Sequence, residues 1–415
     1  MRTVGLVVEY NPFHNGHHYH LQQSVKITRA DAVVAVMSGH FLQRGEPALL
    51  DKWARAEMAL RGGCDLVLEL PVAYATQAAE WFAYGAAAVL DATGVVDALC
   101  FGSETGELGP LREIARTLAE EPAPFRAILA ERLASGSSYP TAFSAAVSRY
   151  MADTGRAEAA AYPLAQPNNT LGLHYIRALE RLRSRIEPYT VKREGAGYND
   201  TEIAHGAIAS ATALRRLLFE TGSLDGLAPF VPESTLRILA REAEAGRAPL
   251  GWHTFAPKLF HELARTPASE LERIHEMTEG LHNRLKGALP SLGRLGLEEL
   301  IAAVKTRRYT RTKLQRALLA LLLGHRKDDV APGRLEGGPG YIRVLGFTDA
   351  GRELLGRMRR TARVPVLLGA ANPPVPLRLL DLDVRATAVY SLGFREPSAR
   401  DLHRDYYERP VMLQA

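Results

Sequence analysis

Cysteine is scarce in this chain, with Cys64 and Cys100 the only two among 415 residues. Two cysteines cannot build a disulfide framework. Because Cys100 lies in an apolar, strand-like run and Cys64 just before another, we interpret both as small buried residues of a protein in a reducing compartment. Long apolar runs are missing too, since none approaches the ~18 residues that a membrane span needs. Arg2 is the only basic residue before the first apolar run, so no signal peptide is expected, and we predict a cytoplasmic protein.

A strong excess of one charge is also absent. The 51 Lys and Arg against 46 Asp and Glu give a net charge of +5 and a pI near 9.1. This balance permits nucleic-acid binding but is equally common among soluble enzymes. With 47% hydrophobic residues, the chain can form packed cores, and 415 residues predict two or three domains. The sequence gives no indication of the oligomeric state.

The most informative stretch is residues 3–29, where an apolar run meets a histidine-rich loop. Residues 4–10 hold five apolar residues among seven, which is typical of a strand buried on both faces. An Asn-Pro pair ends this run, and His14-Asn15-Gly16-His17 follows, before helix-compatible sequence. Gly16 allows a ligand to approach the backbone, imidazoles three residues apart can face the same way, and a helix N-terminus attracts anions. The stretch therefore predicts a polyphosphate site.

Two other interpretations of this loop are open. His14 and His18 have the i, i+4 spacing of some zinc-binding helices. However, neither cysteine is near, and no Asp or Glu lies between the histidines. The histidines could also be a solvated cluster with no ligand. Because strand, turn, glycine and helix all agree with a phosphate site, we favour that hypothesis and predict no metal ligands.

Strand-like and helix-like segments alternate along the first half of the chain. Strands are predicted at residues 32–37, 65–70, 97–102 and 189–193, and helices at 51–61, at 76–90 and through most of 108–182. This alternation predicts an α/β fold with a doubly wound, Rossmann-like parallel sheet, where ligands bind beyond the carboxyl ends of the strands. The histidine loop, Ser38-Gly39 and Gly102 fall at that edge. Gly195 and Gly197 follow the fifth strand.

Two helix starts carry polar residues that bear on the site. Asn168 and Asn169 could cap a helix or contact a ligand. Ser210 and Thr212 precede a helix with Arg215 near its start, which predicts a second anion cradle. Helix capping by either hydroxyl is compatible with that role.

Gly222 and the proline-flanked segment 229–232 predict a domain boundary, which divides the chain into residues 1–222 and 223–415. Beyond it, helical periodicity predicts a mostly helical C-terminal domain. The tail from 343 to 390 mixes strand-like and helical signals.

A basic run within the second half is the best candidate for RNA contact. It surrounds Tyr309 and consists of Lys305, Arg307, Arg308, Arg311, Lys313 and Arg316. Such a run is often only a solvated helix face, but it also suits an RNA phosphate backbone, which is the interpretation that we favour.

Together these motifs resemble a known family. The histidine loop is similar to the signature of the nucleotidyltransferase superfamily, which includes the class I aminoacyl-tRNA synthetases. Residues 8–17 resemble one member over a longer stretch, the bacterial tRNA(Met) cytidine acetate ligase family. The similarity is dense in the first half of the chain and thin in the second, and its further segments are residues 37–48, 101–104, 167–169, 192–198 and 209–215.

The resemblance implies a tRNA-modifying ligase. ATP and acetate would give acetyl-adenylate and pyrophosphate, and the wobble cytidine of elongator tRNA(Met) would then receive the acetyl group to form N4-acetylcytidine. Mg²⁺ is expected with ATP because it neutralises the departing pyrophosphate. The helical domain would hold the tRNA.

The resemblance also implies residue roles. His14 and His17 would contact the ATP phosphates and stabilise the charge that develops during adenylation. Position 40, where we expect asparagine in relatives, is His40. The other residues expected at the ATP site are Val7, Val8, Glu9, Tyr10, Asn11, Pro12, Phe13, Asn15, Gly16, His18, Tyr19, His20, Gly102, Asn169, Arg193, Ser210, Thr212 and Arg215.

Two other functions compete with this one. A small-molecule nucleotidyltransferase acting on a phosphorylated acceptor would use the same histidine loop, but it would not need a large helical extension with a basic run. An RNA-binding protein with a relic nucleotide pocket is the other alternative. Against it, the histidines, Gly16 and the Ser210 segment are all present.

Overall fold

The computed structural model describes residues 1–193 and 209–414, so Gly195 and Gly197 lie outside the described residues. The described residues form an eight-stranded sheet with the order β5-β4-β1-β2-β3-β6-β7, and β8 pairs with β6. The strands are β1 (Thr3–Val8), β2 (Ala32–Ser38), β3 (Leu66–Leu70), β4 (Ala98–Ser103), β5 (Glu187–Lys192), β6 (Ile342–Phe347), β7 (Val366–Leu367) and β8 (Val411–Met412).

The predicted parallel sheet is confirmed. The strands β1 to β5 pair in parallel and occupy the segments that the sequence indicated. From β1 the chain proceeds to β2 and β3 in one direction and to β4 and β5 in the other, so the strand order reverses between β1 and β4. Ligands bind at such a switch point in open α/β sheets.

The tail of the chain also joins this sheet. The strand β6 pairs antiparallel with β3, and β7 and β8 pair in parallel with β6. All six residues of β6 are buried, so the strand-like signal of the tail comes from a strand inside the sheet. The boundary at residue 222 stays a prediction, but the segment after it contributes both strands and helices.

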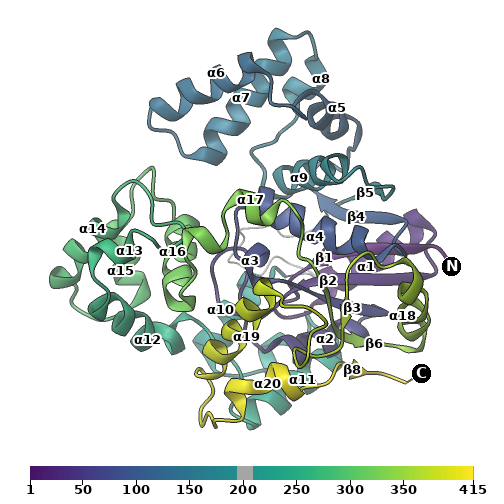
Figure 1. Cartoon of the computed structure of the whole chain (residues 1–415), viewed down its shortest axis with the longest axis vertical. Helices are drawn as coiled ribbons and strands as arrows, with labels where there is room; N and C mark the ends of the chain where they lie inside the picture. The colour runs from purple at the N-terminus through teal and green to yellow at the C-terminus, as the bar shows by residue number, and fades with distance from the viewer. Residues whose placement is uncertain (194–208, 415) are drawn as a thin grey trace.

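Helices cover both faces of the sheet (Figure 1). Alternate residues of β2 point to opposite sides, because Val34 and Val36 belong to one hydrophobic core and Val33, Ala35 and Met37 to another. The helices that contribute to the first core include α3 (Val72–Ala75), α4 (Ala79–Thr93), α9 (Pro167–Arg181), α18 (Asp349–Thr361) and α19 (Arg378–Ser391). Those of the second are α1 (Asn15–Thr28), α2 (Lys52–Arg61), α10 (Ala211–Thr221) and α11 (Glu233–Glu244).

Two groups of helices extend beyond the sheet, one at the top and one at the left of Figure 1. The upper group contains α5 (Gly109–Thr117), α6 (Ala123–Ala134), α7 (Tyr139–Asp153) and α8 (Ala157–Ala161). The left group contains α12 (Trp252–Arg265), α13 (Ala268–Leu271), α14 (Leu281–Ala288), α15 (Leu297–Val304) and α16 (Arg311–Leu323), and it has a hydrophobic core of its own. The predicted C-terminal helical region is therefore present. Short helices α17 (Pro332–Leu335) and α20 (Arg404–Tyr407) follow.

None of the helices that the structure describes is both long and apolar enough to cross a bilayer.

Burial of His174 in α9 gives a first prediction. Its ring stacks on Phe143 at 5.8 Å, and burial lowers its pKa to about 3. Between pH 6.5 and about 3 the unfolded chain binds a proton at His174 that the folded chain does not, so this residue lowers stability as the pH falls.

We expect His174→Phe to make the free energy of unfolding less dependent on pH in that window, by up to about 1.4 kcal/mol per pH unit. Urea unfolding of the variant and the wild type at pH 4, 5, 6 and 8 measures the two slopes. Equal slopes below pH 6 would show that His174 takes up its proton in the folded state as well.

Candidate active site

A cavity of about 240 Å³ lies at the carboxyl ends of β1, β4 and β5. Val7 and Val8 of β1, Gly102 of β4 and Lys192 of β5 line it. The cavity therefore sits at the switch point of the sheet, where the topology favours a ligand site.

Most of the sequence-predicted site residues meet at this cavity. They come from β1, the loop after it, the first turns of α1, the end of β4 and the start of α10. Those lining the cavity are Val7, Val8, Glu9, Tyr10, Asn11, His14, Gly16, His17, Tyr19, His20, Gly102, Arg193, Ser210, Thr212 and Arg215.

Five predicted residues do not line the cavity, and four of them belong to the loop after β1 or to α1. Phe13 is fully buried and contacts the Tyr10 ring. The Asn15 amide donates to the carbonyl of Pro229 at 3.1 Å, and His18 contacts Gln22 at 2.7 Å. The four are Pro12, Phe13, Asn15 and His18.

The fifth is Asn169, and Asn168 lines the cavity instead. The side chain of Asn169 donates to the carbonyl of Pro163 at 3.1 Å and accepts from the backbone N–H of Glu104 at 3.0 Å. The Glu104 carboxylate in turn accepts the backbone N–H groups of both asparagines. Asn169 therefore holds the start of α9 against the loop after β4.

Other residues complete the wall, and among them only Asn168 was a candidate for ligand contact in the sequence. The loop after β2 could have been found, because it follows the carboxyl end of a strand that neighbours β1. The apolar and aromatic residues from α4 and α9 look like ordinary core positions in the sequence. The additional residues are Leu42, Gln43, Arg44, Glu46, Phe82, Phe101, Asn168, Leu171, Tyr175, Val191, Lys192, Ala209 and Ala211.

The two signature histidines stack on each other. Their ring centroids are 3.6 Å apart, with 26° between the ring planes. His14 is the N-cap of α1, and its Nδ1 accepts the backbone N–H of Gly16 at 3.1 Å. The Nδ1 of His17 accepts the backbone N–H of His14 at 3.3 Å. Because each Nδ1 is an acceptor, the proton of each neutral ring is on Nε2.

Both imidazoles are neutral at pH 7. Burial, together with the charges of Arg193 and Arg215, lowers the pKa of His14 to about 3. Burial also lowers the pKa of His17 well below its ordinary value, and the neighbouring His14 and Arg193 add to this effect. The histidines can therefore act as N–H donors to a phosphate, whereas the positive charge of the site comes from arginines.

Arg215 connects three parts of the site. Its Nη1 donates to the carbonyl of Asn11 at 3.0 Å, and its Nη2 pairs with the Glu46 carboxylate at 3.1 Å. Ser210 begins the same helix by accepting the backbone N–H of Ala213 at 3.1 Å. Ser210 thus caps α10, as one sequence-based interpretation expects, and it also lines the cavity, while its contact with an anion stays a prediction.

Gly102 allows Arg193 to lie against β4. A Cβ atom at Gly102 would be 3.2 Å from Cγ of Arg193, which is closer than ordinary packing. Glycine at this position therefore leaves room for a cationic side chain beside the strand end.

His40 lies outside the cavity wall. It is 3% exposed, its Nδ1 contacts Thr387 Oγ1 at 3.2 Å, and its ring lies 4.4 Å from that of Tyr390. His40 therefore packs the loop after β2 against α19. Among the described residues, no three His, Cys, Asp or Glu side chains are grouped so that they could hold a metal ion.

The comparison with known protein families agrees with the fold and site. The pattern of the HIGH Nucleotidyl Transferase family matches residues 1–405. The match covers nearly the whole chain, including the parallel sheet and the His-x-Gly-His loop at its switch point, so the chain is a member of the HIGH nucleotidyl transferases.

Similar proteins define the family more narrowly. A tRNA(Met) cytidine acetate ligase of Acetivibrio thermocellus is 39% identical over 421 residues, covering all of both chains. That of Caldanaerobacter subterraneus is 40% identical over 95% of this chain and 96% of the other. The crystal structure of apo Thermotoga maritima TmcAL covers all of both chains with 38% identity and a TM-score of 0.93, and the structure bound with alpha-thio ATP has a TM-score of 0.90. The chain belongs to the tRNA(Met) cytidine acetate ligase family.

Proposed function

We propose that this chain uses ATP to activate acetate as acetyl-adenylate and transfers the acetyl group to the wobble cytidine of elongator tRNA(Met). The observation that carries the proposal is the pair of stacked, neutral histidines at the switch-point cavity, with Arg193 and Arg215 beside them. Full-length similarity to ligases of that name, and to a structure bound with alpha-thio ATP, supports the substrates. A tRNA substrate also supports a cytoplasmic location.

In the first step a carboxylate oxygen of acetate attacks the α-phosphorus of ATP, and the bond to pyrophosphate breaks. His14 and His17 donate Nε2–H groups to phosphate oxygens, and Arg215 with the N-terminus of α10 adds positive charge. Such a reaction needs positioning and charge stabilisation more than a protein nucleophile. Gly102 meets the nucleotide through its backbone, and Asn168 takes the place that the sequence analysis gave to Asn169.

In the second step the exocyclic amine of the cytidine attacks the acetyl carbon. The bond from that carbon to the oxygen of AMP breaks, the amine loses a proton, and N4-acetylcytidine forms. A base in the anticodon loop can be splayed out to reach the site, because bases of single-stranded RNA are free to unstack.

Mg²⁺ is proposed to enter with ATP. Such an ion would be held by one or two carboxylates together with the ATP phosphates, and it would neutralise the departing pyrophosphate. Glu9 and Glu46 are carboxylates that line the cavity, and burial raises the pKa of Glu9, so a nearby cation would favour its charged form.

Incubation with radiolabelled acetate, ATP and tRNA, followed by nucleoside analysis, tests the proposal. Label in acetylcytidine only when ATP is present is the expected result. Release of pyrophosphate with a phosphorylated metabolite, and no labelled nucleoside, would instead identify a small-molecule nucleotidyltransferase.

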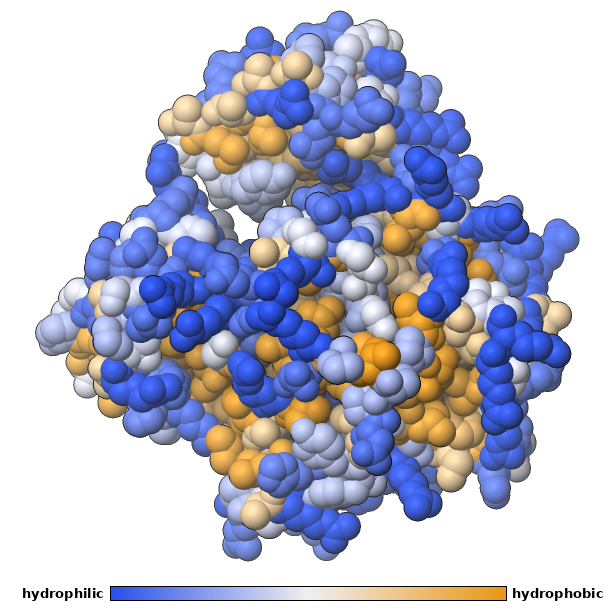
Figure 2. Space-filling view, in the orientation of Figure 1, coloured by the Kyte–Doolittle hydropathy of each residue, from blue (hydrophilic) through white to orange (hydrophobic). Residues whose placement is uncertain are grey.

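Only part of the basic run in the left group is available to bind tRNA phosphates, because some of its cations are already ion-paired. Arg311 is held by the Glu298 carboxylate at 2.5 Å and Arg316 by Glu276 at 2.8 Å. Lys305 and Arg307 have no ion-pair partner among the described residues. The left group is mostly hydrophilic on the face shown in Figure 2, as a surface that meets phosphates would be.

We expect the double substitution of Lys305 and Arg307 by alanine to raise the Kd for tRNA about tenfold. The slope of log Kd against log salt concentration should fall by about 2, which is one for each lost phosphate contact. Filter binding at several salt concentrations measures both values. Arg311→Ala serves as the matched variant, with a smaller expected effect because Glu298 already neutralises this guanidinium. An equal effect of the two variants would contradict the assignment.

A further inference from the structure

Arg55, on the second turn of α2, is a fully buried arginine whose guanidinium contacts backbone carbonyls. Its Nε donates to the carbonyl of Leu50 at 3.1 Å, its Nη1 to that of Glu9 at 2.6 Å, and its Nη2 to that of Gly39. No described carboxylate lies within ion-pair distance of it. A buried charge without a directly paired counter-ion is costly, so these three hydrogen bonds stabilise it, and the carboxylates of Glu9, Asp51 and Glu69 attract it from further away.

Two of the carbonyls that Arg55 holds belong to the residues with which two loops of the cavity wall begin. Glu9 directly follows β1 and begins the histidine loop, and Gly39 directly follows β2. Glu9 lines the cavity, and its carboxylate accepts the backbone N–H of Gln43, another lining residue, at 2.8 Å. Arg55 thus ties the histidine loop to the loop after β2, and both loops form the cavity wall.

The backbone at Gly39 is closely packed and has no room for a side chain. A Cβ atom there would lie 2.6 Å from Oε1 of Glu69, so the strand end is closely packed on one side while Arg55 binds its carbonyl on the other. The Arg55 guanidinium therefore helps to fix the start of the loop after β2, together with the packing of Gly39 and His40.

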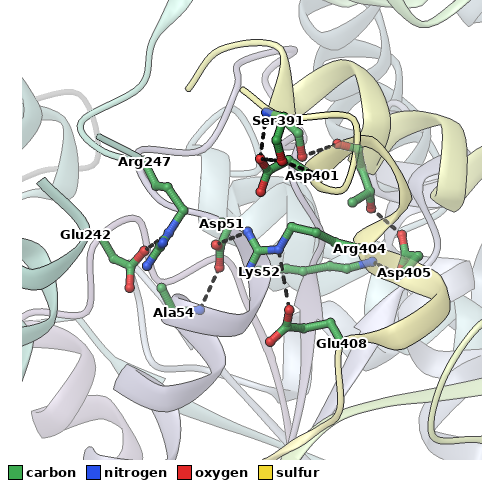
Figure 3. A network of polar contacts seen from close by, with 12 residues as sticks. Asp51, Lys52, Ala54, Glu242, Arg247, Ser391, Asp401, Arg404, Asp405 and Glu408 are labelled. Carbon is green, nitrogen blue, oxygen red and sulfur yellow. Dashed lines mark hydrogen bonds and ion pairs between the residues drawn. The ribbon is translucent and has the colours of Figure 1, made fainter. Parts of the chain in front are cut away.

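The C-terminal segment anchors the helix that carries Arg55 (Figure 3). Asp51, the N-cap of α2, accepts the backbone N–H of Ala54 at 2.8 Å and pairs with Arg404 at 2.8 Å. The next residue, Lys52, donates to Asp405 at 2.8 Å. Because the N-terminus of α2 is held in this way, the position of the Arg55 guanidinium is set before ATP binds.

We propose that Arg55 is a positioning residue for the ATP site, one that acts through the backbone of Glu9 and Gly39 and does not touch the nucleotide. The inference rests on the proposed use of ATP, and it adds a residue that neither the histidine signature nor the cavity wall contains. The planar guanidinium of Arg55 is essential, because it presents several N–H donors in fixed directions. The ammonium of a lysine is a point charge on a flexible stem and cannot match three fixed carbonyls.

The test is Arg55→Lys, with Arg343→Lys as the matched control. Arg343 is the other large, fully buried arginine, but it pairs with Asp405 at 3.0 Å and holds no carbonyl of the cavity loops. We expect Arg55→Lys to raise the Kd for ATP about tenfold, measured by titration calorimetry without acetate or tRNA, and to slow AMP formation. Arg343→Lys should lower the melting temperature and leave the Kd for ATP within about twofold.

Circular dichroism verifies that both variants are folded at the temperature of the titration. A folded Arg55→Lys that binds ATP as the wild type does would overturn the inference, and so would equal weakening by Arg343→Lys, because the effect would then follow stability alone. A wild type that binds ATP but makes no acetylcytidine would refute the proposed function. The role of Arg55 could still be tested in that case, because ATP affinity is measured without acetate or tRNA.

Discussion

Replacing His17 with alanine is expected to lower the rate of acetyl-adenylate formation by roughly 10²–10³-fold, the usual loss when one charge-stabilising donor is removed. The neutral ring of His17 stacks on His14 inside the cavity and carries its proton on Nε2. Its contribution increases as negative charge develops on the phosphate, so the substitution should reduce kcat more than it weakens ATP binding.

Single-turnover release of labelled pyrophosphate, with saturating ATP and acetate, measures this effect. His261→Ala is a suitable control, because that histidine is 70% exposed on α12 and contacts Glu262 on the surface. The control should keep wild-type turnover. A His17→Ala enzyme with nearly full turnover would remove this histidine from the mechanism.

Replacing Asp405 with alanine is expected to lower the free energy of unfolding by about 3–5 kcal/mol, the range for breaking a buried ion pair from one side. Asp405 is 1% exposed and contacts Lys52 at 2.8 Å (Figure 3). It also contacts Arg343 at 3.0 Å. Glu69 is the other carboxylate that pairs with Lys52, at 2.8 Å. Without Asp405, two buried cations would share one carboxylate.

Asp383 cannot compensate for that loss. Burial and the neighbouring Glu69 carboxylate raise its pKa well above the ordinary value, which disfavours a negative charge on it, and it already accepts the Tyr341 hydroxyl at 2.5 Å. The cluster around Asp405 would therefore keep an uncompensated positive charge in the core.

Urea unfolding at pH 7 measures the expected loss. Glu408→Ala is the control from the end of the same segment, since its carboxylate is 39% exposed and lies 3.5 Å from Arg404. A surface pair of this kind contributes at most about 1 kcal/mol. Equal midpoints for Asp405→Ala and the wild type would show that the buried cations release their charge instead.

Local sequence determined the first strand, the histidine loop after it and their place in the sheet. The apolar run, the Asn-Pro pair, Gly16 and the two histidines follow one another along the chain, and each is decided by interactions within a few residues. The order of strands and helices then predicted the parallel sheet, because the topology of such sheets is limited. That is why β1 to β5 and the place of the histidine loop could be predicted before any tertiary contact was known.

Only the tertiary structure decided the rest of the cavity wall. Phe82 and Tyr175 reach the cavity from α4 and α9, where apolar residues at helical spacing look like any core position. Asn168 and Asn169 differ by one position, and the contact with Glu104 determines which of them faces the cavity. Such choices depend on packing between distant segments, which no short stretch of sequence encodes.

The state of the charged groups is also a tertiary property. His14 and His17 have ordinary imidazoles in the sequence, and burial makes them neutral donors in the folded chain. Arg55 and Lys52 look like solvated helix residues until the strand ends and a segment 353 residues away enclose them. The sequence by itself thus determined which groups this protein has at its site, and tertiary burial decided their charge and hydrogen bonding, because desolvation depends on everything that packs around a group.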